Sequence, residues 1–441
     1  MGGGQVTEGL QALRSEALAA VRGYAVEALA VPPFVRGETT VPVAGKVIGA
    51  PELEALVDAS LDGWLTEGRF AQRFAPAFAH AASRDHALLV GSGSQANLLA
   101  VAAACSHLHE RPLRPGDEVV TPALGFSTTV NPIYQQGLVP VYVDVEPDTL
   151  NPTFEAFAAA VGDRTRAVMA AHCLGNPFDA ARLAELCDER GLVLIEDCCD
   201  ALGSTFGGRA VGTFGAAATY SFYPAHHMTT GEGGAVGADD ATWVRALGSL
   251  REWGRDCWCP PGVNDACGRR FDGSFGELPD GYDHKYVFSH VGFNFKITDM
   301  QAALGLAQLE RLEGFHRARR RNFARLDAAF GELDELMVRP RTLEGADPSW
   351  FGYPFTLRDG GPAERRELQR FLLERRIDSR LVLAGNLTRQ PGYQGLEHRV
   401  AGPLTGADRV TEASLWVGCY PGLTDDMIDW IAESVREFLL L

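Results

Sequence analysis

The sequence predicts an α/β fold, with a large domain built on a mostly parallel sheet and a small C-terminal α+β domain. Between residues 118 and 196, short apolar segments of strand character alternate with longer segments of helical spacing. The C-terminal part of the chain carries strand and helix patterns of its own. Alternating strands and helices favour a parallel sheet that helices cover on both faces. Ligands bind such sheets beyond the carboxyl ends of the strands, so a site is expected there.

The N-terminal part of the chain predicts helices on either side of an extended arm. Residues 7–30 have helical spacing and no proline, whereas residues 31–50 hold three prolines and several glycines, which favour an extended arm. Residues 51–83 predict one or two amphipathic helices. The apolar run 86–90 predicts a strand, and a helix is expected after it over residues 95–107.

The middle of the chain contains the alternating region and then a long loop. The expected strands are 118–121, 139–145, 167–172 and 193–196, and the expected helices are 154–161 and 179–190. Residues 254–286 are rich in Gly, Pro, Asp and Cys and predict a long structured loop, a kind of segment that is commonly functional. One long helix is expected over residues 298–331.

These patterns divide the chain into three parts. Residues 1–60 form the N-terminal helix and arm, residues 61–325 the large domain with the Cys-rich loop 254–286, and residues 326–441 the small C-terminal domain. The small domain is expected to contain strands over 352–357 and 415–417 and helices over 363–375 and 424–440.

The composition excludes several classes of function. The 441 residues include 40 Lys and Arg and 57 Asp and Glu, which gives a formal net charge of −17, with 46% hydrophobic residues, as in an ordinary soluble globular enzyme. So acidic a chain disfavours nucleic-acid binding, which needs clustered Lys and Arg. No apolar stretch is long enough to predict a membrane span, and the N-terminal residues lack the apolar core of a signal peptide. We therefore expect a cytoplasmic protein.

The cysteines do not fit this ordinary picture. There are nine of them, an odd number, and a cytoplasmic protein is not expected to form disulfides. Four are scattered and are expected to be small buried hydrophobic residues, namely Cys105, Cys173, Cys187 and Cys419. The other five are crowded into two places, Cys198–Cys199 and the short run from Cys257 to Cys267.

Five segments identify a family resemblance that extends over most of the chain from about residue 60. They are GSGSQANLLA at 91–100, TPALGFSTTVNPI at 121–133, IEDCCDALG at 195–203, SFYPAHHMTTGEGGA at 221–235 and GFNFKITDMQAALG at 292–305. The chain resembles the DegT-type sugar aminotransferases, which depend on pyridoxal phosphate and act on nucleotide-linked keto sugars. This resemblance implies a fold-type I architecture, similar to that of aspartate aminotransferase.

The residues themselves allow two interpretations at each cofactor position. Gly93 and Ser94 open a helix, whose free N–H groups and dipole suit a phosphate, although a plain helix N-cap is the alternative. Asp197 follows a buried strand and is either a partner for a protonated pyridine nitrogen or a solvated carboxylate. The sequence around Phe126 alone favours a core aromatic, whereas the resemblance implies that Phe126 stacks on the cofactor ring.

The resemblance implies two further contacts with the cofactor. Ser221 would hydrogen-bond the phosphate of the cofactor in its own subunit. Asn294 would reach the phosphate that is bound in the neighbouring subunit. The second contact implies a homodimer with shared active sites.

The sequence departs from the family at the residue that normally forms the Schiff base. The family reads Ser-Phe-x-Pro-x-Lys, and here His226 stands at the lysine position, with His227 one position too late. A histidine cannot hold the cofactor covalently but can take a proton near neutral pH. The lysine-to-histidine change resembles the mark of the 3-dehydrases of 4-keto-6-deoxyhexoses, with pyridoxamine 5′-phosphate, or pyridoxal phosphate, held non-covalently. Asp200 and Tyr223 are assigned to orienting His226 or the substrate.

Four cysteines have a spacing that resembles the cluster-bearing branch of these dehydrases. Cys199, Cys257, Cys259 and Cys267 give the pattern C-x57-C-x-C-x7-C. Four thiolates suit zinc as well as a [2Fe–2S] cluster, and the spacing alone favours neither. The resemblance favours [2Fe–2S], fed by a partner reductase (a flavin/iron–sulfur protein, or a ferredoxin or flavodoxin system). Cys198 would be an unliganded, buried neighbour.

The sequence therefore predicts C3 deoxygenation of a nucleoside-diphosphate 4-keto-6-deoxyhexose in deoxysugar biosynthesis. One alternative is a cluster-independent dehydrase that uses an amino donor such as glutamate. Another is a non-catalytic protein on the same fold. An ordinary aminotransferase that uses Lys296 is less attractive, because Lys296 lies far along the chain from the cofactor segment. The nucleotide, CDP or TDP, is left open.

Overall fold

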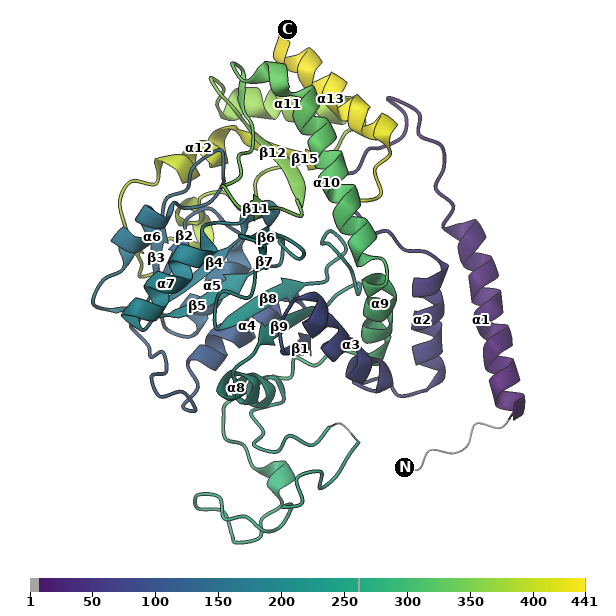
Figure 1. Cartoon of the computed structure of the whole chain (residues 1–441), viewed down its shortest axis with the longest axis vertical. Coiled ribbons are helices and arrows are strands. Elements are labelled where there is room, and N and C mark those ends of the chain that lie inside the picture. The colour runs from purple at the N-terminus through teal and green to yellow at the C-terminus, as the bar shows by residue number, and fades with distance from the viewer. Residues whose placement is uncertain (1–7, 261, 441) are drawn as a thin grey trace.

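The computed structural model describes residues 8–260 and 262–440, and it confirms the predicted α/β class with a mostly parallel main sheet (Figure 1). β9 runs antiparallel to both of its neighbours, while the strands from β8 to β14 pair in parallel. The eight strands are, in spatial order, β1 (His86–Val90), β9 (Gly234–Ala238), β8 (Ala217–Ser221), β5 (Val193–Asp197), β4 (Thr165–Ala171), β2 (Glu118–Pro122), β3 (Val139–Val143) and β14 (Arg399–Val400).

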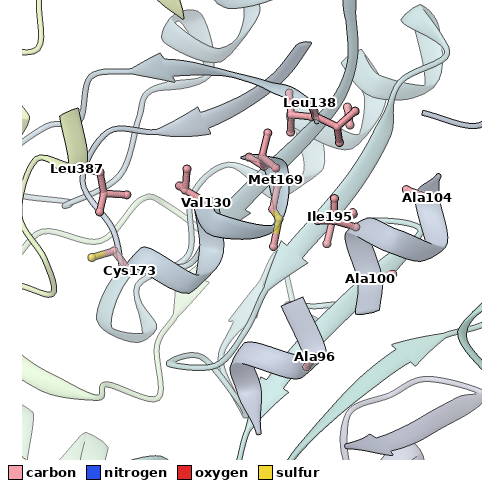
Figure 2. Close-up of a cluster of buried hydrophobic side chains, with 14 of the residues drawn as sticks. Ala96, Ala100, Ala104, Val130, Leu138, Met169, Cys173, Ile195 and Leu387 are labelled. Atoms are coloured by element: carbon pink, nitrogen blue, oxygen red, sulfur yellow. The ribbon is translucent and has the colours of Figure 1, made fainter. Parts of the chain in front are cut away.

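Helices cover both faces of this sheet because its strands bury side chains on both sides. Along β4, Met169 joins the hydrophobic core under α4 (Gly93–Ala104), α5 (Ser127–Gln135) and α8 (Ala241–Arg251). Its neighbours Val168 and Ala170 join the opposite core under α6 (Phe154–Ala160) and α7 (Ala180–Arg190). Successive residues of a strand point to opposite faces, so one strand serves both cores. Figure 2 shows Met169 and Ile195 beside the small alanines of α4, which let that helix lie close to the sheet.

A second, antiparallel sheet lies in the C-terminal part of the chain. Its strands are β10 (Met337–Val338), β12 (Gly352–Leu357), β15 (Ser414–Gly418) and β13 (Ser379–Arg380), and its helices are α10 (Leu312–Ala329), α11 (Pro362–Glu374), α12 (Thr405–Ala413) and α13 (Asp425–Leu440). β14 comes from the same part of the chain but extends the main sheet. The division at residue 325, which falls inside α10, stays a prediction.

The first two N-terminal helices pack along each other, and the second and third pack against a helix from the middle of the chain. They are α1 (Glu8–Ala28), α2 (Ala50–Leu61) and α3 (Arg69–Ala81), and both α2 and α3 pack on α9 (Asp299–Leu309). Arg14 of α1 forms ion pairs with Asp58 and Asp62 at the end of α2. A small sheet of β6 (Thr205–Phe206), β7 (Arg209–Ala210) and β11 (Ala346–Asp347) completes the strands.

One expectation about these elements was wrong, and two strands of the main sheet were not predicted. The single helix over 298–331 is two helices, because the chain leaves the helical path between α9 and α10, where Arg311 donates a hydrogen bond to the fully buried Glu52. Strands β8 and β9 were not predicted, because AATYS and GAVGA contain few of the β-branched and aromatic residues that mark a strand. In the described part of the chain, no helix is long and apolar enough to cross a membrane.

Candidate active site

All of the predicted catalytic and cofactor residues except Asn294 gather at the carboxyl ends of β5 and β8, where the N-terminus of α4 meets them. They line one cavity of about 740 Å³. Eight of them contribute to its wall: Gly93, Ser94, Phe126, Asp197, Asp200, Ser221, Tyr223 and His226. β5 and β8 are neighbours in the sheet, so residues that lie far apart in the sequence end at the same edge.

Asp197 ends β5 with a buried, oriented carboxylate. Its Oδ2 accepts hydrogen bonds from Asn97 Nδ2 at 2.9 Å and from Thr129 Oγ1 at 2.7 Å. Its Oδ1 accepts from the Cys199 backbone N–H at 3.1 Å. Thr219 Oγ1 in turn donates to Asn97 Oδ1 at 2.5 Å. The carboxylate is therefore fixed from α4, α5 and β8, which rules out a freely solvated strand end.

The N-terminus of α4 forms a close-packed corner at the same edge. Ser92 is the N-cap and accepts from the backbone N–H of Gln95, so the plain capping role belongs to Ser92. The first-turn N–H groups of Gly93 and Ser94 have no partner within an α-helix. A Cβ on Gly93 would lie 2.6 Å from Ser221 Cβ, so only glycine lets the backbone approach this closely. Backbone N–H groups and the Ser221 hydroxyl together suit a phosphate.

Phe126 stands at the rim of the cavity, immediately before α5. Its side chain is 52% exposed, so the interpretation as a core aromatic was wrong. An exposed ring on the wall of a cavity is available to pack against a planar ligand.

His226 sits in a turn after β8 and faces the cavity together with Asp200. Its Nδ1 lies 3.3 Å from Asp200 Oδ1, and both side chains are 15% exposed. The turn is closed by the His226 backbone N–H, which donates to the Tyr223 carbonyl at 3.0 Å. Tyr223 itself lies exposed at the cavity rim.

A buried arginine of α10 holds this turn from behind. Arg319 Nη2 donates to the carbonyls of Ala225 and His226, at 3.4 and 3.1 Å, and Nη1 donates to the carbonyls of Trp350 and Phe351. Burial lowers the pKa of Arg319. Its guanidinium thus ties the His226 turn to the segment that enters β12.

His227 points the other way, into the protein. It is 2% exposed, and its Nε2 donates to the Ser349 carbonyl at 2.6 Å. Burial, and then the charge of Arg319, lower the pKa of His227 well below its usual range. A buried, hydrogen-bonded ring of this kind does not face the cavity, which agrees with the choice of His226.

Asn294 lies outside the cavity. Its backbone pairs with that of Glu252 in an isolated bridge, and its Oδ1 accepts from Lys296 Nζ at 2.9 Å. Lys296 Nζ lies 3.5 Å from the centre of the Trp253 ring, away from the cavity residues. Lys296 is therefore badly placed to form a covalent link to a cofactor in this subunit.

The four predicted metal-ligating cysteines lie in two places. Cys257, Cys259 and Cys267 surround a small hollow in the loop together with His284. Cys199 lines the large cavity instead, where its Sγ would lie 3.2 Å from a Cβ on Gly93. The two sets of lining residues share no member, so the four thiols do not converge within one described chain. Cys198 is fully buried, as expected.

The sequence reasoning missed several residues around the cavity. Asn97 lies one helical turn after Gly93, and that spacing would have found it. Arg319 stands in a run of arginines, but its helical spacing from Leu312 and Phe315 would have placed it on the buried face of α10. Arg380, on β13, adds a guanidinium to the wall from the C-terminal part of the chain.

The main sheet, with this cavity at the carboxyl ends of its strands, defines an aminotransferase-type α/β protein. Residues 46–436 match the model of the DegT/DnrJ/EryC1/StrS aminotransferase family, and the chain belongs to that family. It is 50% identical over 427 residues to the lipopolysaccharide biosynthesis protein RfbH of Salmonella typhimurium, covering 97% of this chain and 98% of that protein. It is 49% identical over 434 residues to the dTDP-4-dehydro-2,6-dideoxy-D-glucose 3-dehydratase of Saccharopolyspora spinosa, covering 98% and 94%.

Solved structures show the same fold. The Escherichia coli GDP-4-keto-6-deoxy-D-mannose-3-dehydratase with bound hydrated PLP matches with a TM-score of 0.80 at 28% identity, covering 89% of this chain and 98% of that one. A structure of GDP-4-keto-6-deoxymannose-3-dehydratase with a trapped PLP-glutamate geminal diamine matches equally well, with a TM-score of 0.80 at 27% identity, covering 89% and 99%.

The role of Arg319 can be tested by substitution. Arg319→Leu should lower the free energy of unfolding by about 3 kcal/mol, because four buried carbonyls lose their donor. Arg317→Leu is the matched control on the same helix, since Arg317 is 70% exposed and its ion pair with Glu313 lies at the surface. It should change stability by no more than about 0.5 kcal/mol. Urea unfolding monitored by circular dichroism measures both; equal effects would contradict the anchoring role.

Proposed function

We propose that the protein is a nucleoside-diphosphate 4-keto-6-deoxyhexose 3-dehydratase of deoxysugar biosynthesis that works in the cytoplasm with pyridoxamine phosphate. The observation that carries this proposal is His226, which faces the cofactor-type cavity beside Asp200 at the position where the family has lysine. The names of the similar 3-dehydratases support the same reaction. A histidine in place of the lysine can act as a base but cannot bind the cofactor covalently. It therefore suits a reaction that uses non-covalently bound pyridoxamine phosphate.

The residues of the cavity fit pyridoxamine phosphate. Asp197 would hold the protonated ring nitrogen, because its carboxylate is already oriented by Asn97 and Thr129. The α4 N-terminus and Ser221 would hold the phosphate, and Phe126 would cover the ring. When bound, the cofactor supplies an amine that condenses with the C4 ketone of the sugar and a ring that acts as an electron sink.

His226 is suited to move a proton at the C4′ carbon of the cofactor. Asp200 Oδ1 lies 3.3 Å from Nδ1, on the side of the ring away from Nε2, so Nε2 is the nitrogen left to accept a proton from the cofactor. Arg319 holds the turn, so the ring is positioned before the substrate arrives. The outcome for the sugar is loss of the hydroxyl at C3.

The cavity also suits a nucleotide sugar. Its volume of about 740 Å³ exceeds what the cofactor alone needs, and Arg380 places a positive charge on its wall. A guanidinium is a good partner for a diphosphate. CDP and TDP sugars remain equal candidates.

We further propose that the protein carries a [2Fe–2S] cluster, works as a homodimer and takes electrons from a partner reductase. The support is the loop in which Cys257, Cys259 and Cys267 surround one hollow, because thiolates gathered in this way suit a metal centre. The cluster-independent route with an amino donor such as glutamate gives these three thiols no role. Cys199 does not join these three thiols within one described chain.

Substitution of His226 tests the base directly. His226→Asn should still bind pyridoxamine phosphate but should exchange its C4′ hydrogen with deuterated water at least about 100-fold more slowly, since the base is gone. Mass spectrometry of the recovered cofactor measures the exchange. His398→Asn, which changes an exposed histidine, is the control and should exchange normally. Normal exchange in His226→Asn would show that another group acts as the base.

A second substitution tests the placement of His226. His226→Lys should bind pyridoxal phosphate covalently, so borohydride should fix the cofactor to residue 226. No fixation would contradict the placement of His226.

Metal analysis tests the cluster. Protein purified without oxygen should absorb in the visible and contain iron and sulfide in equal amounts, about two of each per chain. Zinc without iron would contradict the cluster, although the dehydratase proposal for the cavity would stand.

A further inference from the structure

The thiols proposed to hold the cluster occupy two separate parts of the chain. The loop with Cys257, Cys259 and Cys267 projects from the body beyond α8 (Figure 1). Cys199 lies directly after β5 in the wall of the active-site cavity, which has no lining residue in common with the loop hollow. Within the described chain, three of the proposed ligands thus lie together in the loop, and the fourth lies in the wall of the active-site cavity.

Cys199 is placed at the phosphate end of the cavity. Its Sγ would lie 3.2 Å from a Cβ on Gly93, and Ser221 Oγ would lie 2.9 Å from the same point. Its backbone N–H is held by Asp197. The thiol is therefore fixed beside the residues that suit a phosphate, and any group that reaches that phosphate from outside also comes near Cys199.

Backbone hydrogen bonds hold the first residues of the Cys-rich loop (its root) against the segment that contains Asn294. Backbone bridges join Glu252 to Asn294 and Arg255 to Phe288, and the Trp253 N–H donates to the Phe293 carbonyl at 2.5 Å. The Asn294 side chain is exposed and contributes nothing to its own cavity. Wherever Asn294 is placed in an assembly, the beginning of the Cys-rich loop is placed with it.

The Cys-rich loop and the segment that contains Asn294 carry apolar side chains that face solvent. Val291 is 98% exposed, and Trp253, Trp258, Tyr286 and Phe288 are all exposed as well. So many large apolar side chains on one loop and its root indicate a surface that another protein covers. The cavity also has exposed aromatic side chains at its rim, Phe126 and Tyr223, so both surfaces offer apolar contact area.

We propose that a second copy of this chain completes the metal site, so that each cluster is held by Cys257, Cys259 and Cys267 of one subunit and by Cys199 of the other. This inference rests on the proposed function as a homodimer and on the family resemblance, which implies that Asn294 reaches the phosphate bound in the partner subunit. That contact sets the loop root against the corner of Gly93 and Ser221, where Cys199 lies. The same docking covers the exposed apolar side chains.

The loop itself contains one competing fourth ligand. His284 Nδ1 lies 3.8 Å from Cys267 Sγ, and its Nε2 lies 2.8 Å from Asp256 Oδ2. A carboxylate on the far nitrogen is the arrangement that usually orients a metal-binding histidine. A site made of three cysteines and His284 would need no second copy, so the experiment must separate the two ligand sets.

A mixed dimer separates them. One chain carries Cys199→Ala with an intact loop, and the other carries Cys257→Ala, Cys259→Ala and Cys267→Ala with an intact Cys199. Different affinity tags allow the mixed dimer to be purified anaerobically and reconstituted with iron and sulfide. The readouts are iron and sulfide per dimer and the electron paramagnetic resonance spectrum of the reduced cluster, with no need for turnover.

Shared ligation predicts that both variant homodimers lack the cluster, while the mixed dimer recovers half of the wild-type iron with the wild-type spectrum. In the mixed dimer, one of its two sites combines the intact loop with the intact Cys199.

A mixed dimer without iron would overturn the proposal, because the four ligands would then have to come from one chain. A Cys199→Ala homodimer with full iron would also overturn it and would favour His284. If the wild type itself takes up no iron, the cluster in the proposed function fails instead. An unchanged far-ultraviolet circular dichroism spectrum and an unchanged dimer mass for each variant control for folding.

Discussion

The site depends on a buried carboxylate that three elements hold in place at the end of a strand. Asp197 accepts hydrogen bonds from Asn97 of α4 and Thr129 of α5, and Asn97 is itself held by Thr219 of β8. A buried carboxylate without such partners would be costly, so these contacts determine how the helices meet the sheet edge. The N-terminus of α4 is brought against Ser221 by the same packing, and this corner suits a phosphate. The same packing therefore places both Asp197 and the corner that suits a phosphate.

Within this arrangement, a single side chain decides whether the site binds the cofactor covalently or moves a proton. The family places a lysine where this chain has His226, and the surroundings here suit a proton carrier: Asp200 beside one ring nitrogen, and a turn tied down by Arg319. Such a histidine is oriented, and it is sheltered from bulk water without being fully buried. The neighbouring His227, one residue further, shows the contrast, because full burial keeps its ring neutral and directs it into the protein.

The parts of the molecule that could be predicted from sequence are those encoded by short segments. The strands from 118 to 196 and the residues of the four cavity motifs were found because each motif directly follows a strand or opens a helix. β8 and β9 were missed because alanine and glycine carry little strand signal. Arg319 was missed because an arginine is not expected on a buried face, although the apolar spacing of α10 places it there. The spacing of the cysteines suggested four converging thiols, but spacing along the chain does not say which copy of the chain supplies each thiol.

The most direct test of the central claim is the mass of the product. TDP- and CDP-linked 4-keto-6-deoxyhexoses should be incubated with the protein, pyridoxamine phosphate and a reducing system, and the sugar nucleotide then analysed by mass spectrometry. A 3-dehydratase predicts a product that has lost one oxygen atom relative to the substrate and still carries the ketone. A product with an amino group in place of the ketone oxygen would indicate an aminotransferase and contradict the account, and so would unchanged substrate under every reducing system.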